Sequence, residues 1–217
     1  MPPESDGRRV EGFGAFRAGV LHLDLDDVNA RLGSAGLPGL DANVPVWGGG
    51  GYGRVGDVLL GLELHGGLDP SAGSRVRRVS LRGGYGLARA RYVIPPVGGV
   101  TVYPTLGAGA GALWLRIATP GDVTFDHVLR DPAQSATLST GVHPVLDVGV
   151  GLELRIRTTG GDAHAAGILL GVEAGYMLAP ARASWTLGGL SDATGGPDLG
   201  IEGFYLWFSL GGWGAGG

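Results

Sequence analysis

Residues 146–156 read Leu-Asp-Val-Gly-Val-Gly-Leu-Glu-Leu-Arg-Ile, and every second residue in this stretch is a large apolar one. Successive side chains of a β-strand point to opposite faces of the sheet. The alternation therefore predicts a strand with one apolar face and one face of small or charged residues. The same pattern recurs in residues 20–25, 57–65, 168–176 and 203–211, which favours an all-β protein.

Weaker segments extend this pattern to eight predicted strands, at residues 12–25, 43–54, 57–67, 75–92, 99–117, 142–157, 164–178 and 201–213. Most of them are ten residues or longer, whereas strands of soluble proteins most often have about 5–6 residues. A tilted strand needs about 9–11 residues to cross a bilayer. The strand lengths therefore favour a transmembrane β-barrel.

The connections between these strands alternate in length. Long connections follow the first, fifth and seventh strands, at residues 26–42, 118–141 and 179–200, while residues 68–74 form a modest one. The remaining connections are short turns. Outer-membrane barrels place short turns at one rim and long loops at the other. We predict an eight-stranded antiparallel up-and-down β-barrel, with a short helix over residues 27–32 that Asp26 would cap.

Composition limits the other fold and function classes. The chain has 217 residues, 45 of them Gly, no Cys, 17% charged residues and a net charge of -4. So many glycines disfavour a mostly helical protein, since each costs about 1 kcal/mol in a helix relative to Ala. Without Cys there is no disulfide, thiol nucleophile or thiolate metal site, and the charge pattern gives no nucleic-acid footprint. We expect one barrel domain over residues 1–217, with an N-terminal extension at 1–11 and a Gly-rich tail at 214–217.

Residues 92–115 form the longest uncharged stretch, and they are numerous enough to span a membrane as a helix. Pro95, Pro96 and Pro104 interrupt this stretch, and five glycines follow the paired prolines. Such a segment is a poor helix. We therefore interpret it as a turn between two extended segments.

The alternation fits two barrels of opposite orientation. A soluble lipocalin-like barrel, which would bind an apolar ligand, has its apolar residues inside, whereas a membrane barrel has them outside. The polar face decides between them, because glycine packs poorly on a solvated strand but suits a narrow interior. Its glycines include Gly61, Gly84, Gly86, Gly149, Gly151, Gly171 and Gly175. We therefore favour the membrane barrel.

In this orientation the ionisable residues of the polar face would pair inside the lumen, because buried charges must be paired to be tolerated. The predicted network comprises Glu63, Arg78, Arg82, Asp147, Glu153, Arg155 and Glu173. The predicted lipid-facing residues are Val58, Leu60, Leu62, Leu146, Val148, Val150, Leu152, Leu154, Leu170, Val172, Phe204, Leu206 and Phe208. Such a network would plug the lumen against ions.

The chain resembles the eight-stranded outer-membrane β-barrel proteins, the class of the OmpA transmembrane domain and OmpX-like proteins. The resemblance lies in the pattern and includes the stretches at 102–109, 171–176 and 203–208. It implies a cell-envelope protein of the outer membrane, in contact with lipid or detergent. Aromatic residues would mark the membrane interfaces; the candidates are Trp47, Tyr52, Tyr85, Tyr103, Trp114, Tyr176, Trp207 and Trp213.

Motifs for other functions are weak. Gly48, Gly50 and Gly53 match the dinucleotide fingerprint in letters, but a strand follows them where that fingerprint needs a helix. No serine stands beside a histidine as an activated nucleophile; the histidines, His22, His65, His127, His143 and His164, fit a lumenal network or loops better than a catalytic site. Asp24, Asp26 and Asp27 lack the spacing of a calcium loop. We expect no cofactor and no metal.

The leading hypothesis is a non-enzymatic outer-membrane barrel that acts in envelope integrity or surface interaction through its long loops. Phe125, His127, Leu129 and Trp185 could form an apolar contact surface on those loops. A soluble ligand-binding barrel, a lipid-modifying hydrolase or acyltransferase, and a barrel that self-assembles through its apolar exterior are the alternatives. Residues 1–16 hold no apolar stretch of the kind found in export signals, so the expected location rests on the barrel pattern.

Overall fold

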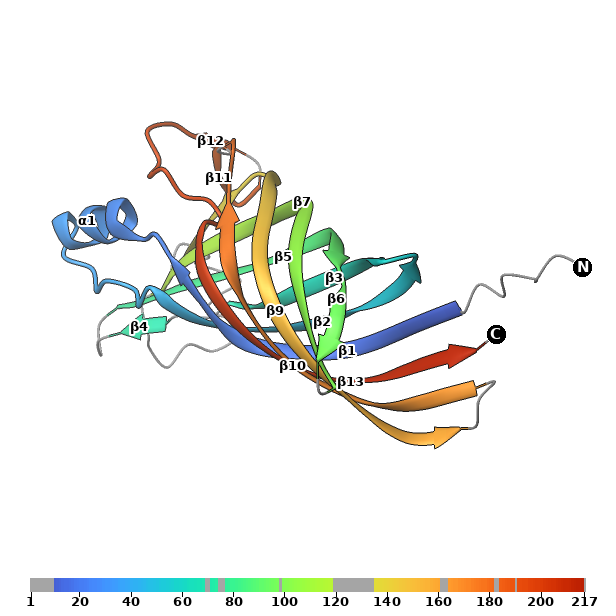
Figure 1. The fold of residues 1–217 in the computed structure, drawn as a ribbon. Helices are drawn as coiled ribbons and strands as arrows, with labels where there is room; N and C mark the ends of the chain where they lie inside the picture. The colour runs from blue at the N-terminus through green and yellow to red at the C-terminus, as the bar shows by residue number, and fades with distance from the viewer. Residues whose placement is uncertain are drawn as a thin grey trace, which may run out of the picture.

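The computed structural model describes residues 10–68, 71–73, 77–97, 99–118, 135–160, 164–181, 184–189 and 191–216. Eight long antiparallel strands form a closed ring in the order β1-β2-β3-β5-β7-β9-β10-β13, and β13 pairs again with β1 (Figure 1). Each strand pairs with the long strand that follows it, so the topology is up-and-down. The predicted eight-stranded barrel is confirmed.

The ring strands are long, as their alternation predicts. Their bounds are β1 Val10–Leu23, β2 Asn43–Val55, β3 Val58–Leu68, β5 Arg78–Tyr92, β7 Val100–Ala118, β9 His143–Gly160, β10 His164–Leu178 and β13 Gly203–Gly216. β13 continues through Gly216 and β1 starts at Val10. The expected tail from residue 214 and the extension through residue 11 are therefore partly strand, because the two ends pair with each other in register.

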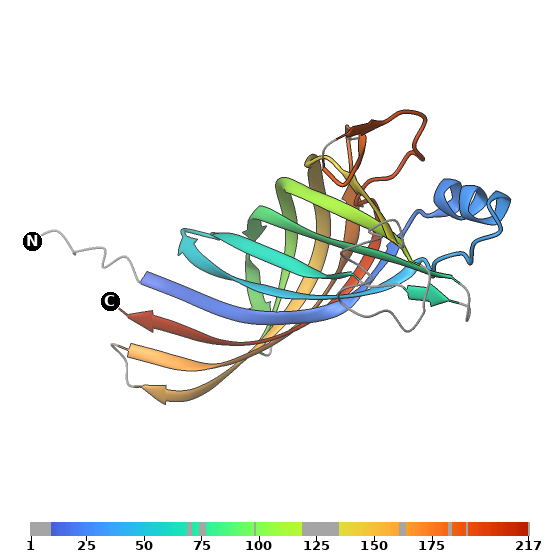
Figure 2. The same cartoon turned by 180° about the vertical axis from the view of Figure 1, so that it is seen from behind.

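The two rims differ. At one rim a tight turn joins β2 to β3, and the short strand β6 (Ile94–Val97) pairs back onto β7. The end of β9 and the start of β10 lie at this rim as well. Gly56 adopts a positive φ of 61° in the turn between β2 and β3, a conformation that favours glycine. β1 begins and β13 ends at this same rim, opposite helix α1 (Figures 1 and 2).

The other rim carries the remaining elements, which are α1 (Asp26–Ser34), β4 (Ser71–Gly73), β8 (Ser135–Thr140), β11 (Trp185–Leu187) and β12 (Ser191–Ala193). β8 pairs with the end of β7, and β11 and β12 extend this pairing beyond the barrel wall. The predicted helix is present, but Leu25 occupies its N-cap and no side chain caps it. Asp26 is therefore the first helical residue and not the cap.

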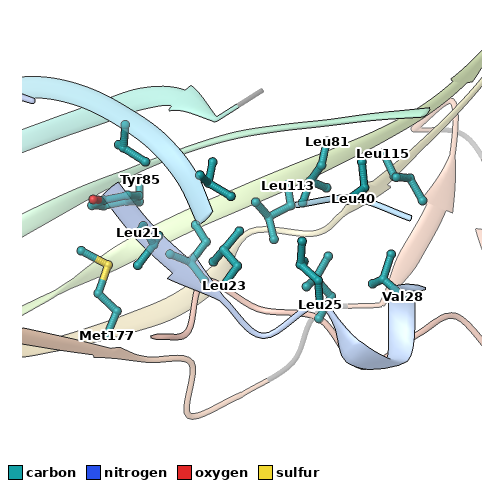
Figure 3. Packing of buried hydrophobic residues seen from close by; sticks show 14 of the residues in the cluster. Leu21, Leu23, Leu25, Val28, Leu40, Leu81, Tyr85, Leu113, Leu115 and Met177 are labelled. Carbon is teal, nitrogen blue, oxygen red and sulfur yellow. The ribbon is translucent and has the colours of Figure 1, made fainter. Parts of the chain in front are cut away.

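The interior at this loop rim is apolar. Leu21, Leu23 and Leu25 pack there, and Val28 and Leu32 of α1 belong to the same cluster (Figure 3). Apolar residues that point inward from β5, β7 and β13 complete this cluster. The loop end of the barrel therefore has an apolar core of the kind found in soluble domains, to which residues of the first and last long connections also contribute.

Candidate functional site: the charged lumen

Three layers fill the barrel interior from rim to rim. At the short-turn rim, Phe13 stacks on Tyr52 with a ring distance of 4.7 Å, and Leu59, Val93 and Leu169 pack around them. The apolar core under α1 occupies the loop end. Between these two apolar layers lies a cluster of buried charged side chains that comes from five of the eight ring strands. This cluster is the candidate functional site.

Arg89 of β5 is at the centre of the charged cluster. Its guanidinium donates to Glu63 at 3.0 Å, to Asp147 at 2.6 Å and to Glu173 at 2.5 Å. It also donates to the Tyr205 hydroxyl at 3.1 Å. One cation therefore connects a carboxylate of β3 with carboxylates of the neighbouring strands β9 and β10 on the opposite side of the barrel.

Two further arginines share the same carboxylates. Arg17 of β1 contacts Glu63 at 3.0 Å and Glu173 at 2.6 Å, and its Nε donates to the Ser209 hydroxyl at 3.0 Å. Arg91 of β5 contacts Glu63 at 3.1 Å and Glu173 at 3.4 Å. Glu63 and Glu173 thus each receive all three arginines of the cluster.

The arginine Arg91 also links the charged layer to the aromatic layer below it. Its guanidinium lies 3.9 Å from the ring centre of Tyr52 and 4.7 Å from that of Tyr103. Such stacking of a guanidinium on aromatic rings is favourable when both are desolvated. The Tyr52 hydroxyl donates to Glu63 at 2.5 Å, so the aromatic rings and the carboxylates orient Arg91 together.

Arg155 extends the network toward the short-turn rim. Its Nε donates to Glu153 at 2.6 Å, and it pairs with Glu11 of β1 as well. Glu11 in turn accepts from Arg54 at 2.9 Å. The chain of ion pairs therefore runs from the middle of the lumen to its short-turn end.

The charges in the lumen balance. Among the described residues, four carboxylates (Glu63, Asp147, Glu153 and Glu173) meet four arginines (Arg17, Arg89, Arg91 and Arg155). The hollow between this layer and the aromatic rings, which Arg17, Tyr52 and Arg91 help to line, has no room for a water molecule. The charges of these lumenal side chains are therefore paired, as expected where taking charges out of water is costly.

The outer wall is the inverse of this interior. Leu62 is 70% exposed and Leu152 45% exposed, whereas their chain neighbours Glu63 and Glu153 are each 2% exposed. A soluble barrel that binds an apolar ligand requires the opposite orientation, so this alternative is wrong. The chain has the fold of the eight-stranded outer-membrane β-barrels.

The chain is similar to several solved structures, each at low sequence identity. No protein-family model and no curated protein matches the chain. Among solved structures it is similar to Neisserial surface protein A (NspA), at 11% identity over 96% of this chain and 97% of that one, with a TM-score of 0.45. It is also similar to the N-terminal β-barrel domain of Pseudomonas aeruginosa OprF (12%, 95% and 96%, TM-score 0.34). A third is the outer membrane protein OprG from Pseudomonas aeruginosa (11%, 95% and 94%, TM-score 0.30).

The structure places five of the seven predicted network residues in the lumen, namely Glu63, Asp147, Glu153, Arg155 and Glu173. The prediction is wrong for Arg78 and Arg82, which are exposed on the outer wall of β5. Inward positions of β5 are the odd-numbered ones, and near the loop rim they carry Val79 and Leu81 of the apolar core. Gly84 and Gly86 share the outward parity of the two arginines, so they do not face the lumen either.

The sequence reasoning missed three of the four arginines that pair in the lumen, namely Arg17, Arg89 and Arg91. A signal for them exists in the sequence, since residues 88–91 read Ala-Arg-Ala-Arg and Arg17 is followed by Ala18. Large polar side chains that alternate with alanine fit an interior position next to a smooth outer wall. In β5 this parity also agrees with the inward-pointing Leu87.

The predicted lipid-facing residues all point outward, in the parity opposite to the lumenal side chains. Most are exposed, while Val58 and Val172 are half-buried by their neighbours. The outward face of β9 from Leu146 to Ile156 carries no charged side chain. A continuous apolar surface therefore covers this part of the wall.

The predicted interfacial aromatics divide into two groups. Trp47 and Trp114 are outward and exposed, and the half-buried Tyr176 packs edge-on against Phe204 on the same outer face. The prediction is wrong for the aromatics that point inward, which are Tyr52, Tyr85, Tyr103, Trp207 and Trp213. They fill the interior because each has an apolar or stacking partner there. Trp213, for example, packs on the aromatic layer, and the guanidinium of Arg155 lies over its ring.

The histidines show no catalytic arrangement in the described part of the chain. His65 is buried, its Nε2 lies 2.9 Å from Glu63, and its ring stacks on Tyr85. Ser209, a nearby lumenal serine, bonds to Arg17. The buried His143 accepts from the backbone of Ile201 at 3.1 Å.

The remaining predicted loop sites are placed only in part. His22 and His164 are exposed, and His127 lies outside the described residues, as do Phe125 and Leu129. Trp185 is buried in the apolar core, where its indole donates to the Pro197 carbonyl at 2.7 Å. It therefore does not contribute to an exposed contact surface. Among the described residues, no group of three or more His, Asp or Glu side chains is arranged so that it could hold a metal ion. No helix in this part of the chain is long and apolar enough to cross a membrane.

Proposed function

We propose that this chain is a non-enzymatic barrel that spans the outer membrane with a closed lumen. The observation that carries the proposal is the inversion of its two faces, with leucine and valine outside and paired charges within. Contact with water would be unfavourable for this large apolar surface. Apolar surfaces of this extent indicate contact with lipid or with another protein.

The dimensions of the apolar wall support the proposal. From Leu146 to Ile156 the outward face of β9 is uncharged over ten residue steps, which is about 34 Å along a strand at about 3.4 Å per residue. With a strand tilt of about 40–45°, this corresponds to about 25 Å along the barrel axis, the height of the apolar band in outer-membrane barrels.

The packed interior supports a structural role. Enzymatic barrels need a nucleophile, a base and access for substrate, whereas the buried His65 and Ser209 each bond to a charged neighbour of the network. The function would therefore lie in envelope integrity and in contacts made by the loop rim. There α1, β11 and β12 form an ordered surface above the barrel.

Site-directed fluorescence tests the membrane placement. The chain has no Cys, so Leu152→Cys and, as a matched control at the loop rim, Thr137→Cys each introduce one label site. In phosphatidylcholine vesicles we expect quenchers on the lipid tails to quench a dye at position 152 strongly and one at position 137 weakly. Equal quenching at both sites, or a purified chain that stays monomeric without detergent, would refute the placement.

Planar-bilayer recording tests the closed lumen separately. We expect no stable open channel for the inserted protein, because paired charges cross the lumen and the hollow beside Arg17, Tyr52 and Arg91 has no room for a water molecule. A large, long-lived conductance would contradict the closed lumen while leaving the membrane placement intact.

A further inference from the structure

Two opposite sides of the outer wall differ in the size of their side chains. In the closed ring, β1 is four strands away from β7 and β13 is four strands away from β5, so the β13–β1 pair lies opposite the β5–β7 pair. Large apolar side chains project outward from β13 and β1, and each is 44–68% exposed. This surface, which we call the phenylalanine ridge, comprises Phe16, Val20, Phe204, Leu206, Phe208 and Leu210.

The opposite side is built from small residues. Leucines of β3 flank it on one edge, where Leu64 packs against Gly86 so closely that an added Cβ would lie 3.0 Å from the leucine. Leucine and valine of β9 flank it on the other edge. Glycine and alanine project less from a sheet than leucine does, so this face is lower than its edges. This small-residue face comprises Gly84, Gly86, Ala88 and Ala90 of β5 with Ala108 and Ala110 of β7.

The charged layer of the lumen shows that the two surfaces lie at the same height. Arg17 of β1 and Arg89 of β5 both contact Glu63 at 3.0 Å. Their chain neighbours point outward, with Phe16 on the ridge and Ala88 on the small-residue face. Outer-membrane barrels carry their long loops on one side of the membrane, so all copies share one orientation. The ridge of one copy therefore meets the small-residue face of another at the same depth.

The area of the small-residue face is adequate for a contact between copies. It extends over ten residue steps from Arg82 to Tyr92 and about three strand spacings, which gives about 500 Å² at about 3.4 Å per residue and 4.8 Å per strand. A contact that covers it buries about 1,000 Å² over both copies, the lower limit for a specific interface. Copies that already share one orientation lose less rotational freedom when they associate, and small residues let two backbones approach closely inside a bilayer.

We propose that copies of this chain associate head to tail in the membrane, with the phenylalanine ridge of one copy on the small-residue face of the next. The two surfaces differ and lie on opposite sides of the barrel, so the contact is heterologous and does not close into a symmetric pair. It extends into a row of barrels in the plane of the membrane. The inference rests on the membrane placement proposed above.

Cysteine cross-linking in phosphatidylcholine vesicles tests this contact, since the chain has no Cys of its own. Phe16→Cys and Ala88→Cys are prepared separately, mixed during refolding into the vesicles and then oxidised. We expect a disulfide-linked dimer in the mixture and little from either variant alone, because the contact brings position 16 of one copy to position 88 of another. The double variant F16C/A88C should give a ladder of longer products.

Two controls use Leu152 of β9, an exposed residue that lies outside both surfaces. Leu152→Cys mixed with Phe16→Cys should give only background cross-linking. Energy transfer between chains labelled at Thr137→Cys measures association without a cysteine in the contact. In that assay Ala88→Phe should weaken association about ten-fold, because the added ring overfills the small-residue face, whereas Leu152→Phe should leave it unchanged.

The possible outcomes separate the contact from the membrane placement. A wild-type chain that fails to insert into the vesicles refutes the proposed function and this contact together. Normal insertion with cross-linking no stronger than in the Leu152→Cys control overturns the contact alone, and lipid then covers both surfaces. Cross-linking of Phe16→Cys by itself as strong as in the mixture would show a symmetric pair and would also overturn the head-to-tail contact.

Discussion

Replacing Arg89 with Met should destabilise the barrel more than any other single change in the lumen. Methionine has a similar length but no charge, so the substitution leaves Glu63, Asp147 and Glu173 without the cation that they share at 2.5–3.0 Å. Removing one partner of a buried ion pair costs about 3–5 kcal/mol. With three carboxylates affected, we expect a loss at the upper end of that range, against a total stability of about 5–15 kcal/mol for typical proteins.

Urea unfolding from phosphatidylcholine vesicles, followed by tryptophan fluorescence and by heat-modifiable mobility in gels, measures this loss. Arg78→Met is the matched control on the same strand, since its side chain is exposed, and it should change the free energy of unfolding by less than about 0.5 kcal/mol. The double variant R89M/E173Q removes one of the carboxylates that lose Arg89, so it should regain stability relative to R89M. The regain should be only partial, because Glu173 also contacts Arg17. A loss below about 1 kcal/mol for Arg89→Met would refute the idea that the charged layer holds the barrel together.

Three further predictions concern the wall, a close strand contact and the loop rim. Leu152→Lys should cost about 2–4 kcal/mol in vesicles if position 152 lies near the bilayer midplane, while Thr158→Lys at the end of the strand should cost less than half of that in the same urea titration. Gly19→Ala should destabilise the β1–β13 pair, because its added Cβ would collide with the Leu206 carbonyl oxygen; Gly14→Ala on the same strand, with its nearest contact at 3.7 Å, should be near neutral, and equal melting temperatures for the two would contradict this. The backbone N–H of Asp198 donates to Asp27 at 3.0 Å, and this bond, together with Arg31, holds the pKa of Asp27 below its usual value of 3.8. The contact between α1 and the β12–β13 connection should therefore be fully present above pH 4 and be lost as the pH falls through the lowered pKa; the NMR shift of the Asp198 amide should report this loss, and Asp27→Asn should abolish the pH dependence.

Much of the barrel follows from the sequence, because strand alternation and connection length are local signals. The alternation is clear in residues 146–156, where leucine and valine alternate with glycine and charged residues. In this stretch the inward and outward faces were predicted correctly. The lumenal carboxylates were found for the same reason. Glu63 and Glu153 each stand between two leucines, so the parity of their strands is unambiguous.

The arginines of β5 show where local reasoning fails. At the loop end of this strand the inward face is apolar, because Val79 and Leu81 pack in the core that residues of α1 also join. The outward face is polar there, with Arg78 and Arg82 exposed. Farther along, the outward residues are glycine and alanine, which mark neither face. The parity of the strand is therefore set by contacts with distant elements, and the assignment of Arg78 and Arg82 to the lumen inverted it.

The prediction for the inward-pointing aromatic residues was wrong for a related reason. Tyr52, Tyr85, Tyr103 and Trp207 would suit a membrane interface by residue type alone. Their inward position depends on partners from other strands, such as Phe13 for Tyr52 and His65 for Tyr85. A single sequence does not show these partners until the register between the strands is known.

The pairing of β1 with β13, in register from Val10–Gly216 to Leu23–Gly203, has a consequence for the order of assembly. The first strand of the ring has to wait for the last one before the sheet loses its free edges, so the barrel cannot close until β13 is available. Arg17 arrives with the first strand, whereas Glu173 and Ser209 arrive near the end. Until β13 joins β1, the unfinished ring therefore has two open strand edges, and Arg17 lacks the partners that these late strands supply.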